Sequence, residues 1–112
     1  MSNNELGSHE MSVLHIINKS PYDRNSLDTC LRLARPGSAI LLIEDGVYAV
    51  RAGSSASATL QQALENYPVY ALQPDLQARG VQPESLIDGI KMVDYDGFVE
   101  LTTEYEKTQS WL

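Results

Sequence analysis

The chain has 112 residues, a formal net charge of −7 at pH 7 and one cysteine. That length predicts one domain with a modest core, and the acidic balance disfavours direct contact with nucleic acid or anionic lipid. A lone cysteine excludes an internal disulfide, and no apolar run reaches the length of a membrane span. Residues 1–10 are polar and aperiodic, so we expect a leader or disordered extension there and a single domain over residues 11–112.

The first third of the chain predicts a strand followed by a helix. The apolar run Val13–Ile17 predicts a short strand that stops at a polar loop with Pro21. Asn25 or Ser26 can then cap a helix. Apolar residues spaced three and four apart give this helix one stripe, and a Pro-Gly pair ends it. The stripe comprises Leu27, Cys30, Leu31 and Ala34.

The most apolar stretch of the chain is residues 39–43, which predict a strand buried on both faces. Glu44, Asp45 and Gly46 follow at its carboxyl end, where open α/β sheets place their functional crevice. An aspartate before a glycine is more typical of a turn than of a catalytic acid. We expect Gly46 to supply a positive φ in a strand-to-helix turn, because glycine adopts that conformation without steric cost.

Strands and helices continue to alternate through the second half of the chain. The predicted elements are a helical turn over residues 47–51, a helix over 58–66, a strand over 69–72, a short helix over 74–79, a strand over 90–93, a helix opened by residues 94–97 and lasting to about 106, and a short edge strand over 109–112. This alternation predicts an α/β fold of three layers, α/β/α, with a small, mostly parallel, flavodoxin-like sheet of four to five strands.

The predicted strand ends gather polar side chains at one edge of the sheet. They are Asn18, Lys19, Ser20, Glu44, Asp45, Gln73, Asp75, Asp94 and Asp96. This rim is acidic, and no glycine-rich phosphate loop follows a strand, so we expect no nucleotide or flavin cofactor. We also expect no metal site, because neither His9 nor His15 has a second ligand at metal-site spacing. His15 is more typical of a buried histidine whose ring is hydrogen-bonded.

Cys30 is the one residue with distinctive nucleophilic chemistry. A cysteine that carries sulfur should be exposed and have a lowered pKa. Cys30 instead lies on the apolar stripe of its predicted helix, more than one turn beyond the cap, where the helix dipole helps little. The pattern favours a small buried hydrophobe, and Cys30 as a persulfide acceptor is the alternative that remains open.

Several segments, in the same order along the chain, resemble the DsrH/TusB family. The likeness spans residues 11–112, and the matching order makes it more specific than any one motif. The segments are Leu14-His15, Asn18-Lys19-Ser20-Pro21, residues 41–49 (Leu-Leu-Ile-Glu-Asp-Gly-Val-Tyr-Ala), Val69–Leu72, Asp75-Leu76-x-Ala78-Arg79-Gly80, Val93-Asp94-Tyr95-x-Gly97-Phe98-Val99 and Gln109-Ser110-Trp111-Leu112.

This resemblance implies a DsrEFH-like fold and a cytoplasmic subunit of a heterohexameric sulfur-relay complex that is not catalytic alone. The implied partners are DsrE/TusD-like and DsrF/TusC-like subunits, and a DsrC/TusE-like protein that accepts sulfur as a persulfide. Cys30 stands where DsrH members tend to carry a cysteine, which points to the DsrH branch and sulfur oxidation and makes Cys30 the candidate catalytic residue. The alternative is a TusB-like structural subunit in a tRNA 2-thiouridine relay, with no catalytic residue of its own.

Overall fold

The computed structural model describes residues 12–23 and 25–111, so the leader predicted over residues 1–10 lies outside the described residues. Five parallel strands form one sheet in the order β4-β3-β2-β1-β5. The strands are β1 (Val13–Ile17), β2 (Ala39–Leu42), β3 (Val69–Leu72), β4 (Lys91–Val93) and β5 (Lys107–Trp111).

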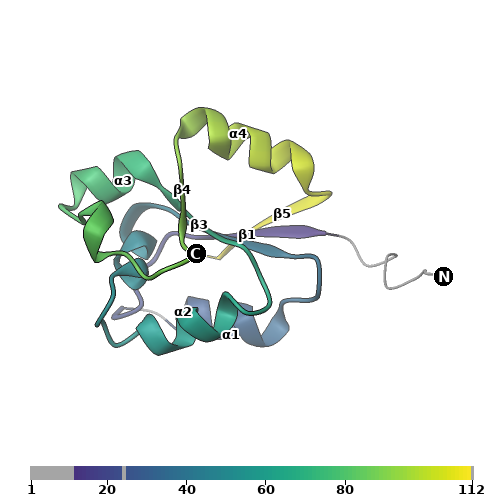
Figure 1. Ribbon diagram of the computed structural model, residues 1–112. Helices are drawn as coiled ribbons and strands as arrows, with labels where there is room; N and C mark the ends of the chain where they lie inside the picture. Colours follow the sequence, from purple (N-terminus) through teal and green to yellow (C-terminus); the bar gives the residue numbers. More distant parts are fainter. Residues whose placement is uncertain (1–11, 24, 112) are drawn as a thin grey trace.

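Helices cover both faces of this sheet, and the strand order explains which helix lies where. The connections from β1 to β4 all move the same way across the sheet, so right-handed crossovers place their helices on one face. The return from β4 to β5 runs the opposite way, and Figure 1 shows α4 on the far side of the sheet from α1 and α2. The helices are α1 (Ser26–Leu33), α2 (Ser57–Ala63), α3 (Gln73–Ala78), α4 (Tyr95–Glu104) and the 3₁₀ segments η2 (Glu44–Val50) and η3 (Pro83–Ser85). The predicted three-layer α/β/α class is confirmed.

Strand β2 lies at the centre of the sheet and is buried on both faces, as its unbroken apolar sequence predicts. Its alternate side chains enter two separate cores. Ile40 and Leu42 pack in the larger core beneath α1, α2 and α3. Ala39 and Leu41 pack in a smaller core beneath α4, to which that helix contributes Leu101. One face of the sheet is therefore covered by α4 alone, whereas α1, α2 and α3 cover the other face.

Several predicted boundaries and one predicted cap differ from the structure. The helix predicted over residues 58–66 ends at Ala63, and the one predicted to last to about 106 ends at Glu104. The last strand begins at Lys107 and not at 109, and the 3₁₀ segment after β2 begins at Glu44 and not at 47. Asn25 occupies the cap position of α1, but its side chain makes no capping hydrogen bond. Asp94 does cap α4, because its carboxylate accepts a 2.8 Å hydrogen bond from the Gly97 amide.

The predicted positive φ at Gly46 is wrong, and a different constraint acts there. Among the described non-glycine residues, Glu44 is the one with a positive φ, at 49°. Gly46 instead lies against β1, where a Cβ atom would collide with the carbonyl oxygen of Ile17. Gly46 is required because the backbone passes too close for any side chain.

None of the helices in the described ranges is long and apolar enough to cross a membrane. The longest, α4, has 10 residues, about half of what a bilayer core requires.

Candidate functional site

Cys30 lies in the middle of α1 and points into the larger core. Its exposed fraction is 0%, and it packs in the same cluster as Ile17 and Leu27. Burial disfavours the charged thiolate and raises the pKa of Cys30 to about 12. At neutral pH the thiol is therefore protonated and shielded, which is the environment of an inert structural cysteine. Its assignment as a persulfide acceptor stays a prediction.

The carboxyl ends of the three central strands are tied together by a side-chain network. The backbone N–H of Glu44 donates a 2.6 Å hydrogen bond to Oδ2 of Asp75, which lies in the first turn of α3 after β3. The Asn18 amide, just after β1, donates to Oε1 of Glu44 across 3.2 Å. The backbone of Glu44, which has a positive φ, is thus held from the β3 side by Asp75, and its carboxylate is held from the β1 side by Asn18.

Arg79 completes this network and was missed by the sequence reading. Its Nε atom donates a 2.8 Å hydrogen bond to Asp45, and its Nη1 atom lies 3.9 Å from the carboxylate of Asp75. The bond to Asp45 raises the pKa of Arg79 above its ordinary value. The available signal was the spacing of Asp75 and Arg79, which are four residues apart, in the first turn and at the C-cap of α3. Arg79 therefore offsets one of the three carboxylate charges in this part of the predicted acidic rim.

The other residues predicted for the rim have separate roles. Ser20 is buried, and its hydroxyl accepts a hydrogen bond from the Tyr22 amide at 3.1 Å. Asp94 caps α4, as described above. Within residues 12–23 and 25–111 no side-chain hydrogen bond or ion pair joins Lys19, Gln73 or Asp96 to the network around Glu44. The structure therefore brings together about half of the predicted rim.

His15 is buried with its ring hydrogen-bonded, as predicted. Its exposed fraction is 5%, and its Nδ1 atom accepts a hydrogen bond from Nε1 of Trp111 across 3.1 Å. Burial lowers the pKa of His15 below its ordinary value. In the described part of the chain, no group of three or more His, Cys, Asp and Glu residues is placed to hold a metal ion.

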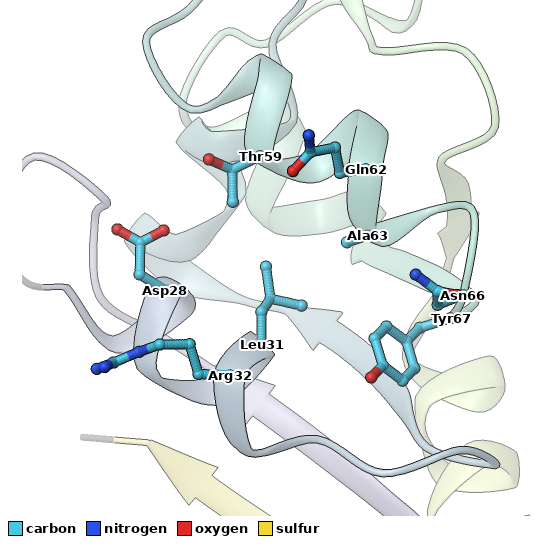
Figure 2. Close-up of a pocket in the computed structure, with 8 residues that line it drawn as sticks. All are labelled: Asp28, Leu31, Arg32, Thr59, Gln62, Ala63, Asn66 and Tyr67. Carbon is cyan, nitrogen blue, oxygen red and sulfur yellow. The ribbon is translucent and has the colours of Figure 1, made fainter.

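A groove of about 330 Å³ runs between α1 and α2 on the outer side of the helical layer that covers Cys30. Figure 2 shows the Leu31 side chain pointing into it from α1, with Thr59 and Gln62 on the α2 side. The lining mixes both charges with apolar groups. It comprises Asp28, Leu31, Arg32, Thr59, Gln62, Ala63, Asn66 and Tyr67. The groove does not reach the thiol, because Cys30 has no exposed surface.

Comparisons with known proteins agree with this architecture. The family model described as DsrH like protein matches residues 19–108. Protein TusB of Pectobacterium parmentieri is 36% identical over 99 residues, which are 88% of this chain and the whole of that protein. Protein TusB of Serratia proteamaculans is 38% identical over 101 residues, with the same coverage.

Two solved structures resemble the fold. The crystal structure of the ychN protein from E. coli superposes with a TM-score of 0.74 at 25% identity, and the match covers 90% of this chain and 99% of that one. A protein of unknown function from Methanobacterium thermoautotrophicum gives a TM-score of 0.63 at 20% identity, with coverage of 85% and 94%. The second likeness concerns the fold alone.

Proposed function

This chain belongs to the DsrH-like family, and we propose that it is a structural subunit of a heterohexameric sulfur-relay complex. Its proposed partners are DsrE/TusD-like and DsrF/TusC-like subunits, and the complex passes sulfur to a DsrC/TusE-like acceptor in the cytoplasm. The observation that carries the structural role is the complete burial of Cys30. A persulfide must be formed by one protein and attacked by another, so its sulfur has to be reached from outside.

The chemistry of sulfur transfer explains why the burial of Cys30 supports a structural role. A thiolate attacks the outer sulfur of a persulfide on the donor, and the donor thiolate leaves as the new persulfide forms. The attacking cysteine must therefore be ionised, and the donor persulfide must be able to reach it. Cys30 meets neither condition in this structure, because its pKa is raised to about 12 and its surface is covered. A relay cysteine on a partner subunit would carry the sulfur instead.

The test is intact-mass analysis of the assembled complex after incubation with a persulfide donor. We expect no gain of a sulfur atom on this chain and a gain on the DsrE/TusD-like subunit. Cys30→Ala should leave transfer to the acceptor unchanged, and the native thiol should react slowly with a maleimide. A stoichiometric gain of one sulfur on this chain that disappears in Cys30→Ala would make Cys30 a relay residue and contradict the proposal.

Two processes are candidates for the complex. The presence of a cysteine at position 30 favours the DsrH branch and sulfur oxidation. The relatives at 36–38% identity carry the name TusB, which favours the tRNA 2-thiouridine branch. A strain that lacks the gene for this chain distinguishes them: loss of 2-thiouridine from its tRNA supports the second branch, and loss of growth on reduced sulfur supports the first.

A further inference from the structure

The last strand, β5, is held to the rest of the protein by different contacts at its two ends. At the amino end, the Glu106 and Lys107 amides donate hydrogen bonds to Oγ and to the carbonyl oxygen of Ser12, each across 3.1 Å. At the carboxyl end, Nε1 of Trp111 donates a hydrogen bond to Nδ1 of His15. Between these contacts β5 lies at the edge of the sheet, beside β1, with exposed side chains (Figure 1).

The carboxyl end of β5 can open without unfolding the rest of the sheet. Four of the five side chains of the strand are exposed, so opening breaks the contacts of the Trp111 indole and a few backbone hydrogen bonds. Strand β1 keeps its pairing with β2, and the larger core keeps its buried members, because Trp111 packs at the margin of that core. Local opening of this kind requires less free energy than global unfolding.

The protonation state of His15 decides whether the indole can form its hydrogen bond. Nδ1 is the acceptor in the closed strand, so the imidazole is neutral and its proton lies on Nε2. A protonated imidazole carries an N–H on both nitrogens, and the Nδ1 proton would then face the indole N–H. Two donors cannot form a hydrogen bond, so a charged ring favours the open strand.

Within residues 12–23 and 25–111, the surroundings of His15 offer no charge that stabilises its protonated form. His15 lies on the face of β1 that enters the larger core, on which α1 packs. Strand β2 has no titratable side chain, and Lys107 of β5 is exposed. On α1, Asp28 and Arg32 are exposed at the outer groove, and Cys30 stays neutral below its pKa of about 12. Burial is accordingly the cause that lowers the pKa of His15 below its ordinary value.

We propose that His15 and Trp111 form a pH-sensitive latch that holds the carboxyl end of β5 against β1. The latch is closed while the imidazole is neutral, and acidification opens it while the rest of the sheet stays folded. Opening exposes His15 to water, where its pKa returns to the ordinary value of 6.5 from the lower value of the closed strand. Protons therefore favour the open strand as the pH falls below about 6.5 and have no effect well above it. The latch is a property of the chain itself and does not depend on the proposed relay function.

The test is native-state hydrogen exchange of the full chain. Protection factors are compared for the amides of residues 109–111 that bond to β1 and for the amides of β2. Each factor is relative to an unfolded peptide at the same pH, so the pH dependence of the exchange chemistry cancels. In urea below the unfolding transition, we expect the protection of residues 109–111 to be independent of urea, because local opening exposes little surface. The protection of β2 should fall with urea, because it is lost only in global unfolding.

The dependence on pH identifies the latch. Between about pH 7.5 and about pH 5.5, the urea-independent protection of residues 109–111 should fall several-fold. The upper limit is about tenfold, because the lower pH is one unit below the ordinary pKa of a histidine.

Three variants assign this effect to the two residues. His15→Asn keeps an acceptor atom bonded to Cγ, as Nδ1 is, but it does not titrate, so the protection of residues 109–111 should no longer depend on pH. His9→Gln is the matched control and should keep the dependence. Trp111→Phe removes the donor, so protection should be several-fold lower already at about pH 7.5, with a smaller further loss in acid. This last variant tests the latch even if His15→Asn does not fold.

Two results would overturn the proposal. If residues 109–111 and β2 have equal protection and equal dependence on urea, β5 opens only when the whole protein unfolds. If local opening does not depend on pH, or keeps its pH dependence in His15→Asn, His15 does not control the latch.

Discussion

The indole nitrogen of Trp111 donates a hydrogen bond to Nδ1 of His15 across 3.1 Å, and the centroids of the two rings lie 6.0 Å apart. The bond joins β5, at the edge of the sheet, to the buried strand β1. Because Nδ1 accepts, the proton of the neutral imidazole lies on Nε2. Every other residue of β5 is exposed, so Trp111 is the side chain that anchors this strand.

Removing the indole donor should destabilise the protein. Trp111→Phe keeps an aromatic ring but leaves Nδ1 of the buried His15 without its partner, which should lower the free energy of unfolding by about 1–3 kcal/mol. Denaturant unfolding followed by circular dichroism measures this change. Gln109→Ala, at an exposed position on the same strand, is the control and should change stability by less than about 0.5 kcal/mol. Equal stability of the two variants would show that the hydrogen bond contributes nothing.

Protonation of His15 should couple stability to pH. Burial lowers the pKa of His15 in the folded state below its ordinary value of 6.5, so the unfolded chain takes up a proton first as the pH falls. Stability should therefore be constant well above pH 6.5 and decrease as the pH falls below that value toward the folded-state pKa. Urea unfolding of His15→Asn should lack this slope. His9→Gln should retain the dependence of stability on pH. If His9→Gln loses this dependence and His15→Asn keeps it, His15 is not the group responsible.

A methyl group at position 46 should separate β1 from the segment that follows β2. The Cβ atom of Gly46→Ala would meet the carbonyl oxygen of Ile17, and a backbone atom cannot move aside as a flexible side chain can. We expect a loss of at least about 2 kcal/mol in unfolding free energy. Gly53→Ala is the matched control: Gly53 has a φ of 81° with no atom near its Cβ position, so it should lose only about 1 kcal/mol. A smaller loss at position 46 than at position 53 would contradict the steric explanation.

The polarity of the core around Cys30 should be visible in two substitutions. Cys30→Ala removes one sulfur atom and leaves a small cavity, with an expected loss of about 1 kcal/mol. Cys30→Ser places a hydroxyl among apolar side chains and should cost about 1–3 kcal/mol if it finds no partner. Thermal unfolding of the isolated chain ranks the two variants. A serine variant as stable as the wild type would mean that the site is more polar than its neighbours indicate.

The sequence predicts the central strands well because their apolar runs have few alternative structures. Strand β5 is harder, since Lys107–Trp111 is polar at four of five positions and carries no alternation. It is a strand because β1 offers it an open edge, beginning with the hydrogen bond from the Lys107 amide to the carbonyl oxygen of Ser12. That partner is far away in the sequence, so the first two residues of the strand were missed.

The pairing of side chains at the rim also depends on residues that are distant in the sequence. The sequence placed Asp45 and Asp75 at one edge, but not the pairing of Asp45 with Arg79, which lies 34 residues away. Gly46 was identified as important for the wrong reason, because the atom that excludes a side chain belongs to Ile17 on another strand. Contacts between distant segments determine both features, and local patterns do not encode them.

The strand order also determines when the sheet can close during synthesis. Strand β5 leaves the ribosome after the other four strands, yet it pairs with β1, the first to emerge. Until then β1 can pair only with β2, and its outer edge stays open to other chains. Chains that stop before residue 107 should therefore aggregate through β1, whereas completed chains protect that edge with a polar strand.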